Sequence, residues 1–420
     1  MQVLNPTEPA IVQGIKTVGI GKKGSKPLTP DLIAEILRDL KENKVSDIAR
    51  GAFFGALFSK GITLDEMRFD DAFASGTLMN PSRLGKIISH DAPSFVQESC
   101  VKLLKVQTLD QKSAYKVGEF LLSKEKGEGA RGLIASVLRV RYETEEEYSG
   151  LLKSFEDSIE PSFRQPVPSG EPIIQLAEPF DGVDQSYMIT PLVAQYLQAQ
   201  NYRVVNLTGR NSGPKFGNNA LDLAQALNIP LAKGNQELVN PKPAFGWYIN
   251  QPDLSKSLDQ WVERRWAIVK RPCFATLEKF LNPVKAQIII TSAFHAPYSE
   301  KMTRIAENAG FPASIVIRNG LEGSLAFPLM RPVKLLCSAR QKDGSYLREE
   351  ITLDPQADFG LKVSVEEKLE NPSLEENARL VKEFSQKQIT NNTLFDQRVK
   401  FTCEGVKRAL TWINDHKRRG

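Results

Sequence analysis

The chain has 420 residues, of which 41% are hydrophobic and 25% are charged. This length exceeds what one ordinary hydrophobic core accommodates, so we expect two or three domains. The composition is that of a globular protein and excludes a largely disordered one. The net charge of +5 suits an anionic partner but does not require one.

Membrane, secreted and zinc-binding classes are disfavoured. No apolar run reaches the roughly 18 residues that a membrane helix needs, and residues 1–9 lack the pattern of a secretion signal. We therefore expect a cytoplasmic protein. The four cysteines stand at long spacings without a Cys-x-x-Cys pair, and there are only three histidines. A zinc site or a disulfide framework is not indicated, and we interpret the cysteines as buried and reduced.

Residues 1–160 have the apolar spacing of a helical domain, and part of the pattern occurs twice. Residues 49–57 align without gaps with residues 130–138, and the same register leads from Thr63 to Thr144. Each of these threonines has a glutamate three places on, which is the capping-box pattern that begins a helix. The sequence therefore predicts a duplicated helical unit.

A proline-rich stretch, residues 161–172, ends the helical pattern, and we interpret it as a short hinge. Strands and helices alternate beyond it, and the part after Asn371 is again expected to be helical. The predicted strands cover residues 173–176, 203–207, 286–290 and 314–317. The predicted fold class is therefore α/β: a helical N-terminal domain, and a mainly parallel sheet covered by helices in a ligand-cleft domain over residues 173–420.

Loops that follow the strands are the candidate sites, because ligands of open α/β sheets bind beyond the carboxyl ends of the strands. The most ligand-like is the loop after the second strand, which combines glycines, hydroxyls, an amide and two cations before a helix. Glycine lets backbone N–H groups approach an anion, and a helix N-terminus favours negative charge. A polar strand-to-helix turn explains the same composition equally well. The candidate ligand residues of this loop are Thr208, Gly209, Arg210, Asn211, Ser212 and Lys215.

Four stretches together resemble one known family. Gly182-Val183-Asp184 stands in place of a glycine-rich diphosphate loop that ends in Asp, and residues 204–209 in place of a strand that leads to Lys-His-Gly-Asn. Residues 271–283 match a segment that begins with a substrate-binding Arg and ends in Asn-Pro, and residues 319–322 match a segment with magnesium carboxylates. In this order and spacing, the chain from Asp31 to Pro332 resembles the anthranilate phosphoribosyltransferase family, which shares its fold with pyrimidine nucleoside phosphorylases.

The resemblance implies roles for particular residues. Gly182 and Asp184 would bind phosphate, Arg271 would engage the acceptor, and Glu322 would hold Mg²⁺. The family transfers phosphoribose from its diphosphate to an amine. Such chemistry needs a cradle for the diphosphate and a cation to neutralise it more than it needs a strong base. The resemblance also implies a homodimer formed through the helical domain.

Several of the family's motifs are degraded here. Thr190-Pro191-Leu192-Val193 replaces Asn-Ile-Ser-Thr, and residues 207–210 replace Lys-His-Gly-Asn. The paired magnesium carboxylates are reduced to Glu322, which is a weaker Mg²⁺ site. These losses match a divergent branch of the family in which the sugar-diphosphate site is degraded and nucleic-acid binding is a described property.

We therefore carry three hypotheses. The first is a phosphoribosyltransferase-like protein whose cleft binds a phosphorylated sugar or nucleotide-like ligand, with biosynthetic pentosyl transfer disfavoured. The second is a non-catalytic nucleic-acid-binding protein, based on the aromatic and basic residues 261–266 and the basic residues 416–420. Tryptophans at such spacing more often pack a helix in a core, and terminal basic residues usually interact with the dipole of a helix C-terminus. The third is a regulatory or scaffold protein that uses the long helical domain. We interpret His90 as a surface or helix-boundary residue. His295 is interpreted as a packed or hinge residue rather than a base, although its position at a strand end keeps it a site candidate.

Overall fold

The computed structural model describes residues 8–21, 24–212, 215–293, 296–363 and 368–419. The chain divides into two compact units. The first unit consists of the residues up to Asp157 together with residues 260–277, and the second contains residues 158–259 and everything from Glu278 onward. This division differs from the expected ranges mainly in residues 260–277, which the sequence pattern had assigned to the sheet domain.

Aromatic packing explains why residues 260–277 belong to the first unit. Trp261 is 2% exposed, and its indole N–H donates to the carbonyl of Leu121 at 2.8 Å. Its ring meets the ring of Phe274 edge-on at 4.4 Å between centroids, and Phe274 in turn packs on Phe155. Buried aromatic contacts of this kind are among the larger contributions to a core. The contacts of Trp261 with Leu121 and of Phe274 with Phe155 join positions more than a hundred residues apart, so no local pattern in the sequence predicts them.

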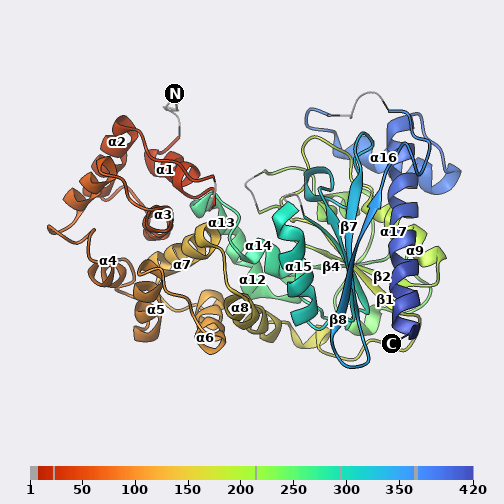
Figure 1. Ribbon diagram of the computed structural model, residues 1–420, viewed down its shortest axis with the longest axis horizontal. Coiled ribbons are helices and arrows are strands. Elements are labelled where there is room, and N and C mark those ends of the chain that lie inside the picture. The colour runs from red at the N-terminus through yellow and green to blue at the C-terminus, as the bar shows by residue number, and fades with distance from the viewer. Residues whose placement is uncertain (1–7, 22–23, 213–214, 294–295, 364–367, 420) are drawn as a thin grey trace. The chain divides into compact units, whose positions relative to one another are not determined.

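The first unit is helical throughout its described residues, as predicted (Figure 1). Helices α2 and α6 have the same length and start 81 residues apart, and so do α3 and α7. Its elements are α1 (Ala10–Val18), α2 (Pro30–Lys41), α3 (Asp47–Lys60), η1 (Asp65–Ala72), α4 (Pro81–Ile88), α5 (Ser94–Leu104), α6 (Gln111–Leu122), α7 (Glu128–Arg141), α8 (Glu145–Asp157), α13 (Trp261–Ile268) and α14 (Phe274–Leu277).

The two predicted capping boxes are both confirmed. The N–H of Thr63 donates to the Glu66 carboxylate at 2.8 Å, and the N–H of Glu66 donates back to the Thr63 hydroxyl at 3.4 Å. Thr144 and Glu147 make the same two bonds at 2.8 and 3.3 Å. Each glutamate also accepts a backbone N–H from 38 residues earlier and binds a basic side chain. The two halves of the unit therefore carry the same contacts at the same spacing.

Helices α3 and α7 touch through their backbones at two equivalent glycines. A Cβ on Gly51 would lie 1.9 Å from the carbonyl oxygen of Gly129, and a Cβ on Gly132 would lie 2.0 Å from that of Ile48. Real Cβ atoms do not approach backbone so closely, so either helix would have to shift. The glycines therefore set the distance between the two halves.

We predict that Gly51→Ala destabilises the first unit. In an ordinary helix interior this change stabilises by up to about 1 kcal/mol, but here the added methyl group meets backbone. The free energy of unfolding should instead fall by about 1–3 kcal/mol. Denaturant unfolding of the full chain, followed by circular dichroism, measures it. As a control, Glu98→Ala on the exposed face of α5 should change this free energy by less than about 0.5 kcal/mol. A Gly51→Ala chain as stable as the wild type contradicts the prediction.

The second unit contains one eight-stranded sheet in the order β3-β4-β2-β1-β5-β6-β7-β8. Every pairing from β3 to β6 is parallel, and β7 and β8 are antiparallel, so the predicted α/β class with a mainly parallel sheet is confirmed. The sequence analysis did not anticipate β3, β4, β7 or β8. The strands are β1 (Ile173–Ala177), β2 (Arg203–Thr208), β3 (Leu231–Ala232), β4 (Trp247–Asn250), β5 (Ile288–Ala293), β6 (Ala313–Arg318), β7 (Val333–Arg340) and β8 (Tyr346–Leu353).

Helices cover both faces of this sheet. Figure 1 shows α9 and α17 on one face and α15 on the other. The central strands β1, β2 and β5 are buried along their whole length, as expected for parallel strands between two helical layers. The helical C-terminal part is confirmed. The helices are η2 (Pro161–Phe163), α9 (Thr190–Ala199), α10 (Ala220–Ala226), η3 (Asn235–Glu237), α11 (Gln251–Leu254), α12 (Lys256–Asp259), η4 (Glu278–Phe280), α15 (Ala296–Asn308), η5 (Leu321–Gly323), α16 (Leu374–Lys387) and α17 (Thr393–Arg419).

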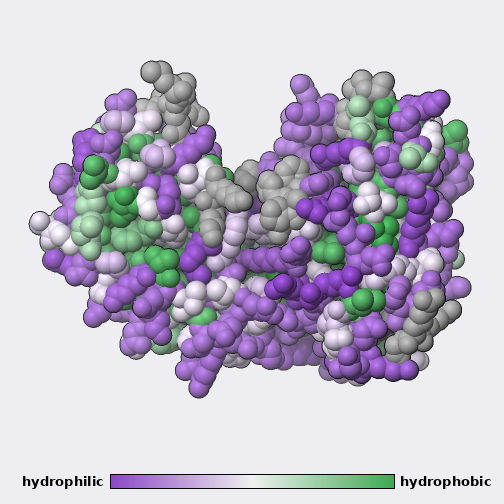
Figure 2. All heavy atoms as spheres, viewed as in Figure 1, coloured by the Kyte–Doolittle hydropathy of each residue, from purple (hydrophilic) through white to green (hydrophobic). Residues whose placement is uncertain are grey.

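The surface and the cysteines agree with the composition. Hydrophilic residues cover most of the face drawn in Figure 2, and hydrophobic residues are confined to smaller areas. Among the described residues, none of the helices has the length and apolar character needed to span a bilayer. The four cysteines are free and buried, as predicted.

Candidate ligand site

The loops after β1 and β2 are held together backbone to backbone. Val183 and Asn218 exchange two N–H···O bonds, of 2.8 and 2.9 Å. Gly182 has a φ of +72°, and a Cβ there would lie 2.3 Å from the carbonyl oxygen of Asn218. A Cβ on Gly217 would lie 2.4 Å from that of Val183. Gly182, predicted to bind phosphate, thus has a structural reason to be glycine, and its predicted role stays a prediction.

Asn219 organises the same two loops, although it was not among the site residues predicted from the sequence. Its side chain caps α10 in a capping box with Asp222. The amide group of Asn219 also donates to the carbonyl of Phe180 at 2.8 Å and to that of Gly209 at 3.0 Å. The signal in the sequence was Asn219-x-x-Asp222, which has the spacing of the Thr-x-x-Glu pairs that located the capping boxes of the first unit.

Glu322, in the loop after β6, reaches both of these loops. One carboxylate oxygen accepts the N–H of Asp184 at 3.0 Å and the ammonium of Lys215. The other accepts the N–H of Gln185 at 3.0 Å and the hydroxyl of Ser186 at 2.7 Å. We call these donors the oxyanion nest: the backbone N–H groups of Asp184 and Gln185, the Ser186 hydroxyl and the Lys215 ammonium. The structure therefore brings together three of the predicted site residues, Asp184, Lys215 and Glu322.

The charges in this cluster are coupled. Burial opposes ionisation of Glu322, but its interactions with the side chains of Asp184, Lys215 and Ser186 and with the N–H of Asp184 outweigh it and lower its pKa to about 2. The pKa of Asp184 is raised by its interaction with the Glu322 carboxylate and by burial, against the attraction of Lys215. Lys215 lies 3.8 Å from the Asp184 carboxylate. Of the two carboxyl groups, Glu322 is therefore the one that loses its proton first as the pH rises.

This arrangement does not fit Mg²⁺ at Glu322. A carboxylate offers about four lone-pair positions, and four donors take them here. One of these donors is an ammonium, which would repel a second cation. In the parts of the chain that the structure describes, no cluster of three or more His, Cys, Asp or Glu side chains could hold a metal ion.

The remaining predicted residues of the loop after β2 are engaged within the protein. Arg210 forms a two-pronged ion pair with Asp259, with N···O distances of 2.8 and 2.9 Å. The Thr208 hydroxyl is buried and donates to a backbone carbonyl of β4. The amide of Asn211 donates to the carbonyl of Gly217 at 2.6 Å. These contacts shape the loop, and the predicted ligand roles of the three residues stay predictions.

Two buried hydroxyls near the strand ends lack hydrogen-bond partners. Ser212 is 1% exposed and Ser292, near the end of β5, is 2% exposed. Among the residues that the structure describes, neither oxygen has a hydrogen-bond partner. A buried polar group without a partner is uncommon, and a ligand atom is one way to satisfy it. Gly209, another predicted ligand residue, packs against Phe180. A Cβ on Gly209 would lie 2.6 Å from the Phe180 ring.

Thr190, where the family's phosphate-binding element would lie, turns inward. Its hydroxyl donates to the carboxyl group of Glu178, which also accepts the N–H of Leu325 at 2.7 Å. Glu178 is 3% exposed, and this burial raises its pKa despite the two hydrogen bonds. The contact ties the end of β1 to α9 and to the loop after β6.

Residues from other parts of the prediction lie elsewhere. Arg271 belongs to the first unit, so its predicted acceptor role stays a prediction. His90 is exposed at the end of α4, as interpreted from sequence, and its ring contacts the carbonyl of Ile87. His295 lies outside the described residues. Trp261 is buried, whereas Trp266 is 47% exposed, so only one of the two tryptophans packs a core. Arg264 forms an ion pair with Glu128.

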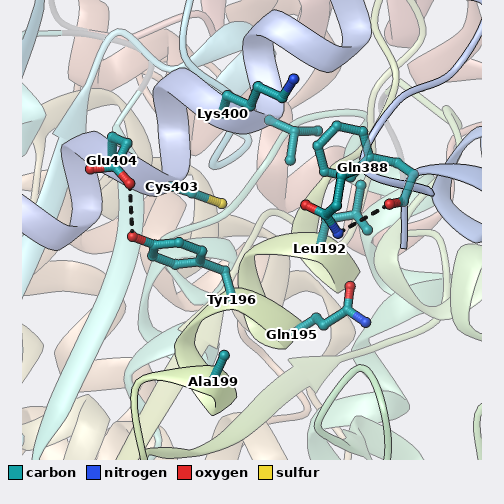
Figure 3. Close-up of a pocket in the computed structure, with 10 residues that line it drawn as sticks. Leu192, Gln195, Tyr196, Ala199, Gln388, Lys400, Cys403 and Glu404 are labelled. Atoms are coloured by element: carbon teal, nitrogen blue, oxygen red, sulfur yellow. Dashed lines mark hydrogen bonds between the residues drawn. The ribbon is translucent and has the colours of Figure 1, made fainter. Parts of the chain in front are cut away.

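A separate cavity of about 640 Å³ lies between α9, α16 and α17. Figure 3 shows the Tyr196 hydroxyl turned toward Glu404, to which it donates at 3.1 Å. None of the predicted ligand residues lines this cavity. Its lining consists of Leu192, Gln195, Tyr196, Ala199, Phe384, Gln388, Val399, Lys400, Cys403 and Glu404.

Comparison with known proteins identifies the architecture. The structure of anthranilate phosphoribosyltransferase from Thermus thermophilus superposes with a TM-score of 0.58 at 19% identity, over 76% of this chain and 94% of that one. The enzyme from Saccharomyces cerevisiae, in complex with PRPP and Mg, superposes with a TM-score of 0.57 at 14% identity, over 78% and 95%. This chain has the anthranilate phosphoribosyltransferase fold. The fold expected from the sequence resemblance is thereby confirmed.

Comparisons of sequence give less information about this chain than the comparisons of structure. No protein-family model matches the chain. An uncharacterized protein of Aquifex aeolicus is 24% identical over 238 residues, which cover 57% of this chain and 70% of that protein. Function must therefore be argued from the site, because one fold supports many activities.

We predict that Lys215→Met raises the pKa of Glu322, because it removes one of the interactions that favour its charged form. Carbon-detected NMR of the side-chain carboxyl groups measures this pKa, which should lie well below the ordinary 4.5 in the wild type. Ionised Glu322 then stabilises the fold fully above that ordinary value, and this contribution is lost as the pH falls toward 2. Lys233→Met, which breaks an exposed pair with Asp253, is the control and should leave Glu322 unchanged. An ordinary pKa for Glu322 in the wild type contradicts the prediction.

Proposed function

We propose that the second unit binds a phosphate- or ribose-bearing ligand at the carboxyl edge of its sheet, without the magnesium-dependent transfer of a biosynthetic phosphoribosyltransferase. The observation that carries this proposal is the oxyanion nest. Loops that follow β1 and β2 converge there on one acidic group, with two backbone N–H groups, a hydroxyl and an ammonium as donors. Donor sets of this kind bind phosphate oxygens. The ligand class also agrees with the PRPP-bound structure that shares the fold.

The charges at this edge support binding rather than transfer. Departure of a diphosphate leaves a concentrated negative charge that cations must stabilise. Here Arg210 is paired with Asp259, and Lys215 is paired with Glu322. Because Glu322 does not fit Mg²⁺ as it stands, the Lys215 ammonium is the cation that this proposal assigns to the ligand. Transfer to an amine acceptor, with Arg271 as the acceptor-binding residue, is not part of the proposal.

The other expected partners have less support. Trp261 of the aromatic and basic segment is buried and Arg264 is paired with Glu128, so neither supports that segment as a nucleic-acid-binding surface. The side chains of residues 417–420 lie outside the described part. A homodimer formed through the helical unit, a scaffold role and a cytoplasmic location stay predictions from the sequence.

Isothermal titration calorimetry of the full chain with phosphoribosyl diphosphate tests the proposed function. We expect binding with a dissociation constant below about 1 mM, corresponding to about 4 kcal/mol, and equal in the presence of EDTA or of Mg²⁺. Binding that requires Mg²⁺ would contradict the proposal and favour the magnesium-dependent transfer of a biosynthetic phosphoribosyltransferase. An absence of heat at millimolar ligand in both conditions would remove the ligand class. Glucose 6-phosphate is the control for a phosphate group without the diphosphate.

A further inference from the structure

The oxyanion nest already holds an anion, and that anion is part of the protein. Both oxygens of the Glu322 carboxylate accept two donors each. Three of the donors come from consecutive residues, 184–186, and the fourth comes from Lys215 in another loop. The nest is therefore a complete site for two oxygens, with one ammonium to balance their charge.

Nothing in the donor set is specific for a carboxylate. Backbone N–H groups, a hydroxyl and an ammonium bind phosphate oxygens through the same charge-assisted hydrogen bonds. A phosphate group carries more negative charge than a carboxylate and presents three oxygens, so it can satisfy the same donors. The nest also supplies its own cation, and it therefore needs no divalent metal.

The backbone conformation and partial exposure of Glu322 favour exchange of its carboxylate for another anion. Its backbone has a φ of +53°, a left-handed conformation that glycine adopts freely and glutamate rarely does. Gly320 and Gly323 flank it in a short turn. The Glu322 side chain is 12% exposed and that of Lys215 is 24% exposed, so the nest lies at the surface of the unit and is not sealed in the core.

We propose that Glu322 is an internal ligand that closes the oxyanion nest, and that a phosphate group binds there by displacing its carboxylate. This inference rests on the proposed function in that both use the same edge of the sheet. Displacement frees the two N–H groups and the hydroxyl for the incoming oxygens, and Lys215 exchanges one anion for another. In this proposal the anion-binding groups of the oxyanion nest are intact, and the Glu322 carboxylate occupies them.

The test compares wild type with Glu322→Gly, which removes the carboxylate and suits the positive φ. The measurement is the affinity for inorganic pyrophosphate in EDTA by calorimetry. We expect the variant to bind at least about tenfold more tightly than the wild type. Adding Ser186→Ala to the variant should reverse part of the gain, because one donor of the nest is lost. Circular dichroism checks that each variant folds. If Glu322→Gly does not fold, the same titration is made with Glu322→Gln.

Glu307→Gln is the matched control, because Glu307 is also a buried carboxylate in an ion pair, with Arg348, and lies near the opposite edge of the sheet. It should gain no affinity for pyrophosphate. Equal affinities of wild type and Glu322→Gly, or no binding by either, would overturn the inference. If the wild type binds phosphoribosyl diphosphate while Glu322→Gly gains nothing, only the inference fails. If Glu322→Gly binds pyrophosphate and the wild type binds no phosphoribosyl diphosphate, only the proposed function fails.

Discussion

The candidate site depends on the hydrogen bonds by which two strand-end loops bind the Glu322 carboxylate. Four donors from two loops meet one acidic side chain from a third loop. A carboxylate that accepts hydrogen bonds from several loops holds those loops together. The Glu322 carboxylate therefore fixes the loops relative to each other. The same interaction removes Glu322 from metal binding and pairs Lys215.

Close backbone contact, made possible by glycine, is the second constraint, and it operates in both units. Gly51 and Gly132 let α3 and α7 of the first unit touch, and Gly182 and Gly217 let two loops of the second unit pair. Any side chain at these positions would push apart groups that hydrogen-bond or pack across the contact. One glycine, Gly182, thus has a steric role in this fold that is independent of whether its N–H meets a phosphate.

The function that we propose differs from the transfer reaction of the enzymes that share the fold. The arrangement of strands is that of anthranilate phosphoribosyltransferases, but the cations at the sheet edge are neutralised by Asp259 and Glu322. A transferase needs positive charge that is available to the departing diphosphate. A binding protein needs only a site that an anion can enter. The internal pairing of charges therefore favours binding over catalysis on an inherited scaffold.

Local patterns in the sequence determined much of the architecture. Both capping boxes, the repeated helical unit, the four central strands and the C-terminal helices follow from spacing and capping chemistry, which act over a few residues. Asp184, Lys215 and Glu322, which the sequence singled out, lie together in the structure, and their ligand and metal roles stay predictions. Their actual partners, and the return of residues 260–277 to the first unit through Trp261, were decided by tertiary structure. Hydrogen bonds between residues more than a hundred positions apart leave no periodic signal, because they depend on where the sheet brings its loops.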